Sequence, residues 1–431
     1  MFEDVLVEQN PHWTGRLYAK GIERESLKEV LHYLKVPHAI SITGVRRAGK
    51  STILKQAINF LIGEKKVNPK NILFANLEHP YFSQYAHDVQ YLERIFEDYL
   101  KIGNPRGKIY CFLDEIQFFA NWPLFIKAHY EQGNIKFIIT GSNSFLMSHE
   151  LLTLLSGRTL PVAIYPLSFK EIISAKLEIK TFDALTLSKH RHEIRRLLDE
   201  FLRFGGFPEV VQLREETLAD DILNAYSKTI LYQDVAARLN LKKPLNLERL
   251  FYYLSSHLGA SFSYTGLAEL FDLTDKTVKE YIEALKDANL LFEVDRFFFS
   301  LKKQIRGAKK IYSIDTGMAN AIAFKFSENR GRLFENALFI ELKRRKKEIY
   351  YYKTAANYEV DFVVKEKKQL ELLQVCIELH EKSQTREVRA LVQAATELNL
   401  KKGILITADF EKEWTVDGIE ICAIPLYKFI S

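Results

Sequence analysis

Short apolar runs alternate with amphipathic segments in the first 165 residues of the chain. Ala39–Thr43, Asn71–Leu77, Ile109–Leu113 and Ile135–Thr140 have the length and composition of strands that are buried on both faces of a sheet. After the first of them, Ile53–Ile62 places apolar side chains at helical spacing. Strands that alternate with helices predict an α/β domain with an open, mostly parallel sheet.

A helical pattern replaces this alternation after residue 166. Residues 167–255 repeat apolar positions at i, i+3 and i+4 beside charged faces, which predicts a helical lid or linker. Gly205–Glu209 interrupts the pattern with glycine and proline, and we expect a hinge or loop there.

Two more patterns fill the rest of the chain. Ser263–Leu291 predicts a short helix, a turn and a longer helix with Thr274 as its N-cap, and wing strands are expected at 292–299 and 309–313. Together these elements resemble a winged helix-turn-helix. A helix, three strands, a helix and a strand are then predicted at 331–347, 349–353, 359–364, 370–377, 387–398 and 403–407.

Composition narrows the class of protein only a little. The 431 residues suffice for about three domains, and 47% hydrophobic residues with 27% charged residues exclude wholesale disorder. The net charge of +6 is too mild to indicate nucleic-acid binding unless the excess is local. Three distant cysteines exclude a disulfide framework, and no apolar stretch is long enough to span a membrane. We expect a cytoplasmic protein with no membrane partner.

The most specific motif lies between the first predicted strand and its helix. Residues 44–52 read GVRRAGKST and match GxxxxGK[ST], the P-loop. Its glycines let backbone N–H groups face a polyphosphate, Lys50 adds a mobile charge, and Ser51 offers a hydroxyl to Mg²⁺. The residues expected to bind nucleotide are Gly44, Val45, Arg46, Arg47, Ala48, Gly49, Lys50, Ser51 and Thr52.

Two other predicted strands end in polar residues. Asp114 and Glu115 follow Ile109–Leu113, and because ligands bind at the carboxyl edge of such sheets, we expect Asp114 to hold Mg²⁺ with Ser51. Glu115 is then expected to orient or deprotonate the attacking water. Asn143, after Ile135–Thr140, is the candidate for sensing the γ-phosphate, although a plain turn at the strand end explains it nearly as well.

These motifs resemble a known family. GVRRAGKST, CFLDEIQFFANW, FIITGSNSF and LLSGRTLPVAIYPLSFKE are similar to the AAA-type P-loop ATPases of bacteria and archaea that end in a domain of unknown function, itself similar to the PD-(D/E)XK nucleases. The resemblance covers nearly the whole chain and implies ATP as the nucleotide, while the residues themselves do not exclude GTP. It implies an ATPase domain (1–166), a helical lid or linker (167–255), a winged helix-turn-helix (256–325) and a nuclease-like α/β domain (326–431).

The resemblance also assigns roles to arginines. It places Arg46 and Arg47 near the phosphates and an arginine at position 158. An arginine that neutralises charge on the transferred phosphoryl group accelerates hydrolysis, in cis or from a neighbouring subunit. Spacing leaves open whether Arg158 acts in its own chain, acts across a homo-oligomer, or pins a loop.

In the nuclease-like region the resemblance puts Glu335, Asp361 and Gln374 at the acidic positions. Neutral Gln374 and Cys376 stand where the nucleases have an acid and a lysine, so we expect a degenerate site. Glu378 shares a strand face with Gln374 and is the candidate for a migrated ligand.

Basic residues gather in the second half of the chain. One group surrounds the predicted wing and the other is the run 343–347; the residues concerned are Lys302, Lys303, Arg306, Lys309, Lys310, Lys343, Arg344, Arg345, Lys346 and Lys347. They make DNA a candidate partner. A structural or protein-docking role for the winged-helix region and a helix-dipole role for the run 343–347 stay open.

The sequence therefore predicts an ATPase whose Mg²⁺-dependent hydrolysis rearranges a winged-helix and nuclease-like C-terminal half. Two alternatives are an ATP-gated, metal-dependent DNA nuclease and a nucleotide-switched DNA-binding regulator with little turnover.

Overall fold

The computed structural model describes residues 1–141, 155, 157–213, 215, 217–323, 330–377 and 381–431, of which 381–384 by their backbone only. The chain divides into two compact units, residues 1–165 and 166–431. No helix in the described ranges is long and apolar enough to cross a membrane.

The first unit is built on a five-stranded sheet. Its strands are β1 (Ala39–Gly44), β2 (Ile72–Asn76), β3 (Ile109–Asp114), β4 (Ile135–Gly141) and β5 (Thr159–Ile164). All neighbours pair in parallel, in the order β2-β3-β4-β1-β5. The prediction of an α/β fold with a parallel sheet is therefore confirmed.

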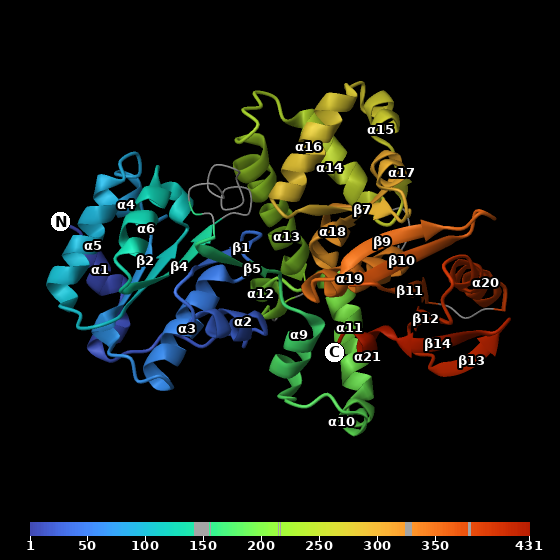
Figure 1. The fold of residues 1–431 in the computed structure, drawn as a ribbon, viewed down its shortest axis with the longest axis horizontal. Coiled ribbons are helices and arrows are strands. Elements are labelled where there is room, and N and C mark those ends of the chain that lie inside the picture. Colours follow the sequence, from blue (N-terminus) through green and yellow to red (C-terminus); the bar gives the residue numbers. More distant parts are fainter. Residues whose placement is uncertain (142–154, 156, 214, 216, 324–329, 378–380) are drawn as a thin grey trace. The chain divides into compact units, whose positions relative to one another are not determined.

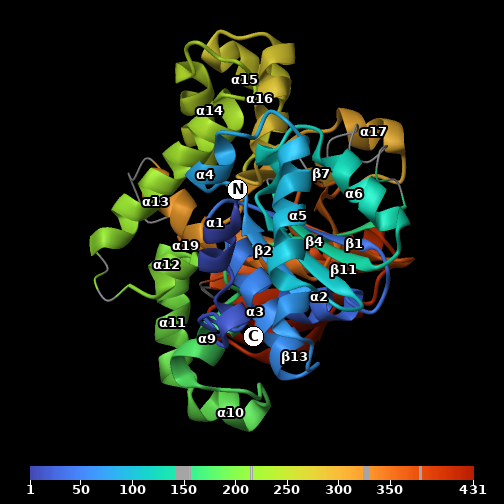
Figure 2. The same cartoon turned by 90° about the vertical axis from the view of Figure 1, so that its left-hand side faces the viewer.

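Helices cover both faces of this sheet, as buried parallel strands require. They are α1 (Glu3–Gln9), α2 (Ser26–Tyr33), α3 (Lys50–Gly63), α4 (Pro80–Ser83), α5 (Gln90–Gly103) and α6 (Trp122–Glu131). Alternate side chains of the strands, among them Leu73, Cys111 and Phe137, join α1, α5 and α6 in one buried cluster. Helix α3 packs on the sheet's other face (Figure 1, Figure 2).

The second unit begins with helices. These are α9 (Phe169–Leu177), α10 (Ala184–Lys189), α11 (Arg191–Phe204), α12 (Pro208–Val211), α13 (Thr217–Thr229), a π-helical turn (Ile230–Ala236) and α14 (Leu245–Ser256). Of the predicted hinge, residues 205–207 separate α11 from α12, whereas Pro208 and Glu209 begin α12 and were wrongly placed in the loop. The glycines are closely packed: a Cβ on Gly205 would lie 1.9 Å from Asp315 Oδ1, and Gly206 N–H donates to Asp315 Oδ2 over 2.7 Å. The loop needs glycine because a carboxylate occupies the space of a side chain.

A nine-stranded sheet forms the rest of the second unit, in the order β13-β14-β12-β11-β10-β9-β7-β8-β6. Its strands are β6 (Ser261–Phe262), β7 (Leu291–Arg296), β8 (Lys309–Ser313), β9 (Glu348–Lys353), β10 (Glu359–Glu366), β11 (Gln369–Cys376), β12 (Lys402–Thr407), β13 (Lys412–Val416) and β14 (Ile419–Pro425). Its helices are α15 (Tyr264–Phe271), α16 (Asp275–Asp287), α17 (Leu301–Arg306), α18 (Thr316–Ile322), α19 (Arg330–Arg344), α20 (Glu381–Glu397) and α21 (Leu426–Phe429).

The predicted winged helix and the predicted nuclease-like region share this sheet, because β7 pairs in parallel with β9. Thr274 caps α16 as expected, accepting from Thr277 N–H over 3.1 Å. The first wing strand is shorter than predicted: β7 ends at Arg296, although the next N–H, that of Phe297, still donates to the Tyr351 carbonyl on β9. The winged-helix and PD-(D/E)XK descriptions, and the four-part division, stay predictions.

Candidate functional site

The P-loop joins β1 to α3 at the carboxyl edge of the parallel sheet. Gly49 has φ +98° and Arg47 has φ +67°, both in the left-handed region, so the chain turns sharply before α3 begins at Lys50. A Cβ on Gly44 would lie 2.2 Å from the Ile164 carbonyl oxygen, which explains the glycine at the end of β1. No described side chain caps the start of α3, so its first N–H groups and positive dipole end suit an anion.

The Lys50 side chain is buried beneath the P-loop. Its side chain is 4% exposed, and Nζ donates to the Gly44 carbonyl over 3.2 Å and lies 3.4 Å from Glu115 Oε1. The Lys50 ammonium thus has one carboxylate and one carbonyl oxygen as partners, and the oxygens of a polyphosphate can replace both.

Asp114 is the last residue of β3 and Glu115 follows it; β4 separates β3 from the P-loop strand. Thr140 on β4 bridges this gap: its hydroxyl donates to Asp114 Oδ1 over 2.5 Å and accepts from Glu115 N–H over 2.9 Å. Ser51 also hydrogen-bonds Asp114. Both hydroxyls thus hold the carboxylate toward the P-loop.

The pKa values of Asp114 and Glu115 shift in opposite directions. Burial raises the pKa of the Asp114 carboxyl, and the Ser51 and Thr140 hydrogen bonds only partly oppose this. Burial acts in the same sense on Glu115, but the Lys50 ammonium and a 2.5 Å hydrogen bond from Gln117 Nε2 bring the pKa of Glu115 below its usual value. Glu115 is therefore ionised at neutral pH and able to accept a proton.

The donor set fits Mg²⁺. A buried carboxylate beside a P-loop hydroxyl supplies two hard oxygen ligands, and Mg²⁺ commonly takes the rest from water and phosphate. Ser51 and Asp114 are the residues that would hold the ion, and this assignment stays a prediction.

The structure places Arg46 at the P-loop but Arg158 at the opposite end of β1. Arg46 Nη1 lies 3.4 Å from Glu78 Oε1, at the P-loop. Arg158 precedes β5, where its carbonyl accepts from Ala39 N–H at the amino end of β1, and Nη2 lies 3.5 Å from Glu131 Oε1. The length of β1, about 16 Å, separates this end from the P-loop, so Arg158 does not meet the nucleotide site of its own chain. Its catalytic role stays a prediction.

Asn143 lies outside the described residues, as does Glu378. Thr140 is the polar group that the structure brings between the two acids, and sequence reasoning missed it. The available signal was a hydroxyl near the end of an otherwise apolar strand.

Arg24 was also missed. It is 4% exposed and donates to the Ala48 carbonyl over 2.7 Å and to the Tyr165 carbonyl over 2.6 Å, so it braces the P-loop against the end of β5. Nothing in the local sequence signals this role, because the arginine lies far from the motif along the chain.

In the second unit the three predicted nuclease-like residues also come together. Asp361 N–H donates to Gln374 Oε1 over 2.9 Å, and Gln374 Nε2 donates to Glu387 Oε2 over 2.7 Å. Lys310 Nζ lies 3.1 Å from Glu335 Oε1 and 3.5 Å from Asp361 Oδ1. Burial and the nearby Glu335 carboxylate raise the pKa of Asp361 to about 8.

The basic clusters are less available than the sequence suggested. Lys310 is buried, and Lys309 pairs with Asp295. The basic run 343–347 lies at the end of α19. In it, Arg344 donates to the Pro166 carbonyl over 2.5 Å, Arg345 pairs with Glu341, and Lys347 pairs with Glu366. These side chains have partners within the protein, whereas Lys302, Lys303 and Arg306 on α17 are exposed.

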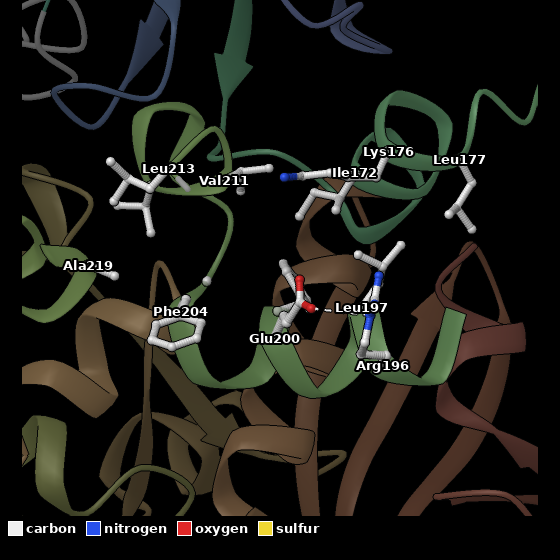
Figure 3. A pocket seen from close by; sticks show the side chains of 13 residues that line it. Ile172, Lys176, Leu177, Arg196, Leu197, Glu200, Phe204, Val211, Leu213 and Ala219 are labelled. Atoms are coloured by element: carbon white, nitrogen blue, oxygen red, sulfur yellow. Dashed lines mark ion pairs between the residues drawn. The ribbon is translucent and has the colours of Figure 1, made fainter. Parts of the chain in front are cut away.

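A separate cavity of about 370 Å³ lies among the first helices of the second unit (Figure 3). Arg196 and Glu200 form an ion pair across one turn of α11 at its wall, with the nitrogen and oxygen 3.5 Å apart. The other lining residues include Ile172, Lys176, Leu177, Leu197, Phe204, Val211, Leu213 and Ala219. None of the predicted site residues lines this cavity.

Three family models match consecutive parts of the chain. An AAA domain matches residues 36–173, a domain of unknown function (DUF8612) matches 195–329, and another (DUF4143) matches 330–427. Among solved structures, a Walker-type ATPase of Pyrococcus abyssi is similar with a TM-score of 0.43 at 14% identity, covering 72% of this chain and 99% of that one. AMPPCP-bound DnaA from Aquifex aeolicus has a TM-score of 0.28 at 18% identity, covering 65% and 92%.

Two uncharacterized proteins are similar along nearly their whole length. One, from Haemophilus influenzae, is 30% identical over 406 residues, which is 93% of this chain and 96% of the relative. The other, from Methanocaldococcus jannaschii, is 34% identical over 449 residues, which is 100% and 95%. The chain therefore belongs to the family that includes these two proteins, and it carries an AAA-type P-loop ATPase domain over residues 36–173.

Proposed function

We propose that the protein is a Mg²⁺-dependent ATPase whose hydrolysis cycle rearranges its C-terminal half. The observation that carries the proposal is the meeting of Lys50, Ser51, Asp114 and Glu115 at one edge of the parallel sheet. ATP is the expected nucleotide because the AAA family match supports it.

Each residue has a separable task. The N–H groups of the loop and Lys50 bind the β- and γ-phosphates, and Lys50 exchanges its contacts with Gly44 and Glu115 for phosphate oxygens. Ser51 and Asp114 hold Mg²⁺, which when bound neutralises charge on the phosphates. Glu115 accepts a proton from water as the water oxygen bonds to the γ-phosphorus and the bond to the ADP oxygen breaks.

Phosphate release from Mg-ATP tests this assignment. Lys50→Ala is expected to lose both nucleotide binding and release, since it removes the charge at the phosphates. Glu115→Gln is expected to keep nucleotide binding and lose roughly 100-fold or more in release, because the amide cannot accept the proton. Equal turnover in wild type and Glu115→Gln would favour the alternative of a nucleotide-switched regulator.

DNA binding is a second candidate function, and the exposure of α17 favours it. This helix buries none of its residues, and Lys302, Lys303 and Arg306 are all exposed on it. Cations presented in this way can neutralise phosphates without reading bases.

Salt-dependent retention on duplex DNA tests the α17 surface. Replacing Lys302, Lys303 and Arg306 by alanine together is expected to weaken retention and flatten its salt dependence. Lys309→Ala is the matched control and is expected to leave retention unchanged, because Lys309 is engaged by Asp295. Equal retention by wild type and the triple variant would remove this candidate.

A further inference from the structure

Four charged side chains form a compact group in the second unit, which we term the carboxylate cluster: Lys310 on β8, Glu335 on α19, and Glu359 and Asp361 on β10. Lys310 Nζ lies 3.1 Å from Glu335 Oε1, 3.0 Å from Glu359 Oε1 and 3.5 Å from Asp361 Oδ1. The lysine side chain is 1% exposed, so its charge is compensated almost entirely by these three acids.

The ammonium occupies the centre of the group. A lysine has three N–H donors and no acceptor, which matches one oxygen from each of three carboxylates. A divalent cation would take the same oxygens at shorter distances, and cannot share the position with a buried ammonium because the two positive charges would repel.

Two of the acids also have other partners in the protein. Tyr312 OH donates to Glu335 Oε1 over 2.6 Å, and Val375 N–H donates to Asp361 Oδ2 over 2.9 Å. Gly259 lies against Glu335 so closely that a Cβ there would be 2.7 Å from Oε2. The backbone before β6 thus covers the Glu335 carboxylate.

Two features of the second unit bring the members of the carboxylate cluster together. The β9–β10 pairing shifts its register between Val360 and Val363, an irregularity of the kind that redirects side chains, and Asp361 lies within it. Tyr312, two residues from Lys310 on the same face of β8, stacks on Phe339 of α19 with ring centroids 4.4 Å apart. Packing of β8 on α19 therefore brings Lys310 to Glu335.

We infer that Lys310 is the resident cation of the carboxylate cluster: it fills the place of a divalent metal and ties β8 to α19 and β10, so the cluster serves as an internal ionic joint and not as a metal-dependent nuclease site. This inference does not depend on the proposed ATPase function. It agrees with the neutral Gln374, because three acids already outnumber the single ammonium and a fourth carboxylate would add more negative charge.

Calcium binding to nucleotide-free protein tests the inference. In titration calorimetry, wild type and Asp361→Asn are expected to bind equal amounts of Ca²⁺, because Lys310 keeps the cluster closed to the ion. Any Ca²⁺ held at the P-loop cancels in this comparison. Wild type binding an additional Ca²⁺ ion that Asp361→Asn lacks would overturn the inference.

Removing the ammonium should open the site. Lys310→Ala is expected to bind an additional Ca²⁺ ion per chain and to show a Ca²⁺-dependent rise in Tm, which Lys310→Ala combined with Asp361→Asn should lose. Lys309→Ala, a lysine removed from the same strand outside the cluster, is the control and should gain nothing. A folded Lys310→Ala without Ca²⁺ binding would contradict the inference; if that variant does not fold, the wild-type and Asp361→Asn comparison still decides it.

Discussion

Both units contain a buried lysine beside carboxylates, but the two lysines are held in different ways. Lys50 contacts one carboxylate and one carbonyl at the start of a helix, at the open edge of a parallel sheet. Lys310 contacts three carboxylates from within a strand, and a tyrosine hydroxyl and a glycine backbone cover its principal partner. Lys50 can exchange its two partners for a ligand, which suits a binding site. Lys310 has a carboxylate for each of its three N–H donors, which suits a structural joint.

The largest expected contrast is in stability. Lys310→Met should lower the free energy of unfolding of the second unit by about 3–5 kcal/mol, because it leaves three partly buried carboxyl groups without their cation. Lys50→Met should cost the first unit less than about 1 kcal/mol, because Glu115 keeps its bond from Gln117 and is partly exposed. Calorimetric unfolding of each variant measures the difference. Similar losses of unfolding free energy in the two variants would contradict the distinction between Lys50, which can exchange its partners, and Lys310, which cannot.

A smaller effect is expected for the hydroxyl between the acids. Thr140→Val keeps the shape of the side chain but removes the donor to Asp114 and the acceptor for Glu115 N–H. We expect a loss of about 1–3 kcal/mol in unfolding free energy and a roughly 10- to 100-fold fall in phosphate release, since Glu115 loses its anchor but keeps its carboxylate. Chemical unfolding and phosphate release at saturating ATP measure the two effects.

The matched control for this variant lies in the other unit. The buried Thr407 hydroxyl on β12 donates to the Phe410 carbonyl over 2.5 Å. Thr407→Val should cost a similar amount of stability and leave phosphate release unchanged. If both valine variants slowed release equally, Thr140 would have no special place at the nucleotide site.

Much of the first unit could be predicted from local sequence. The strand, loop and helix around Lys50 are contiguous, and the acids follow an apolar run, so periodicity and motif spacing locate each piece. Strand order could not be derived in this way. It is β4, lying between β1 and β3, that puts Thr140 beside Asp114, and no local pattern states which strands are neighbours.

The second unit shows the same limit more strongly. The pattern of β8 was predicted correctly, but Lys310 was expected on a solvated wing and is instead buried against α19. That outcome depends on packing between segments distant along the chain, including the β7–β9 pairing. Charge counted along the sequence therefore overstated the basic surface of this half.

The central claim is that the P-loop and the two acids at the end of β3, Asp114 and Glu115, form a working nucleotide site. It is tested most directly by phosphate release from Mg-ATP, measured for wild type and for Glu115→Gln at nucleotide concentrations that saturate both. We predict release by wild type and almost none by the variant, although both bind ATP. Equal release by the two proteins, or no detectable binding of Mg-ATP to wild type, would contradict the account.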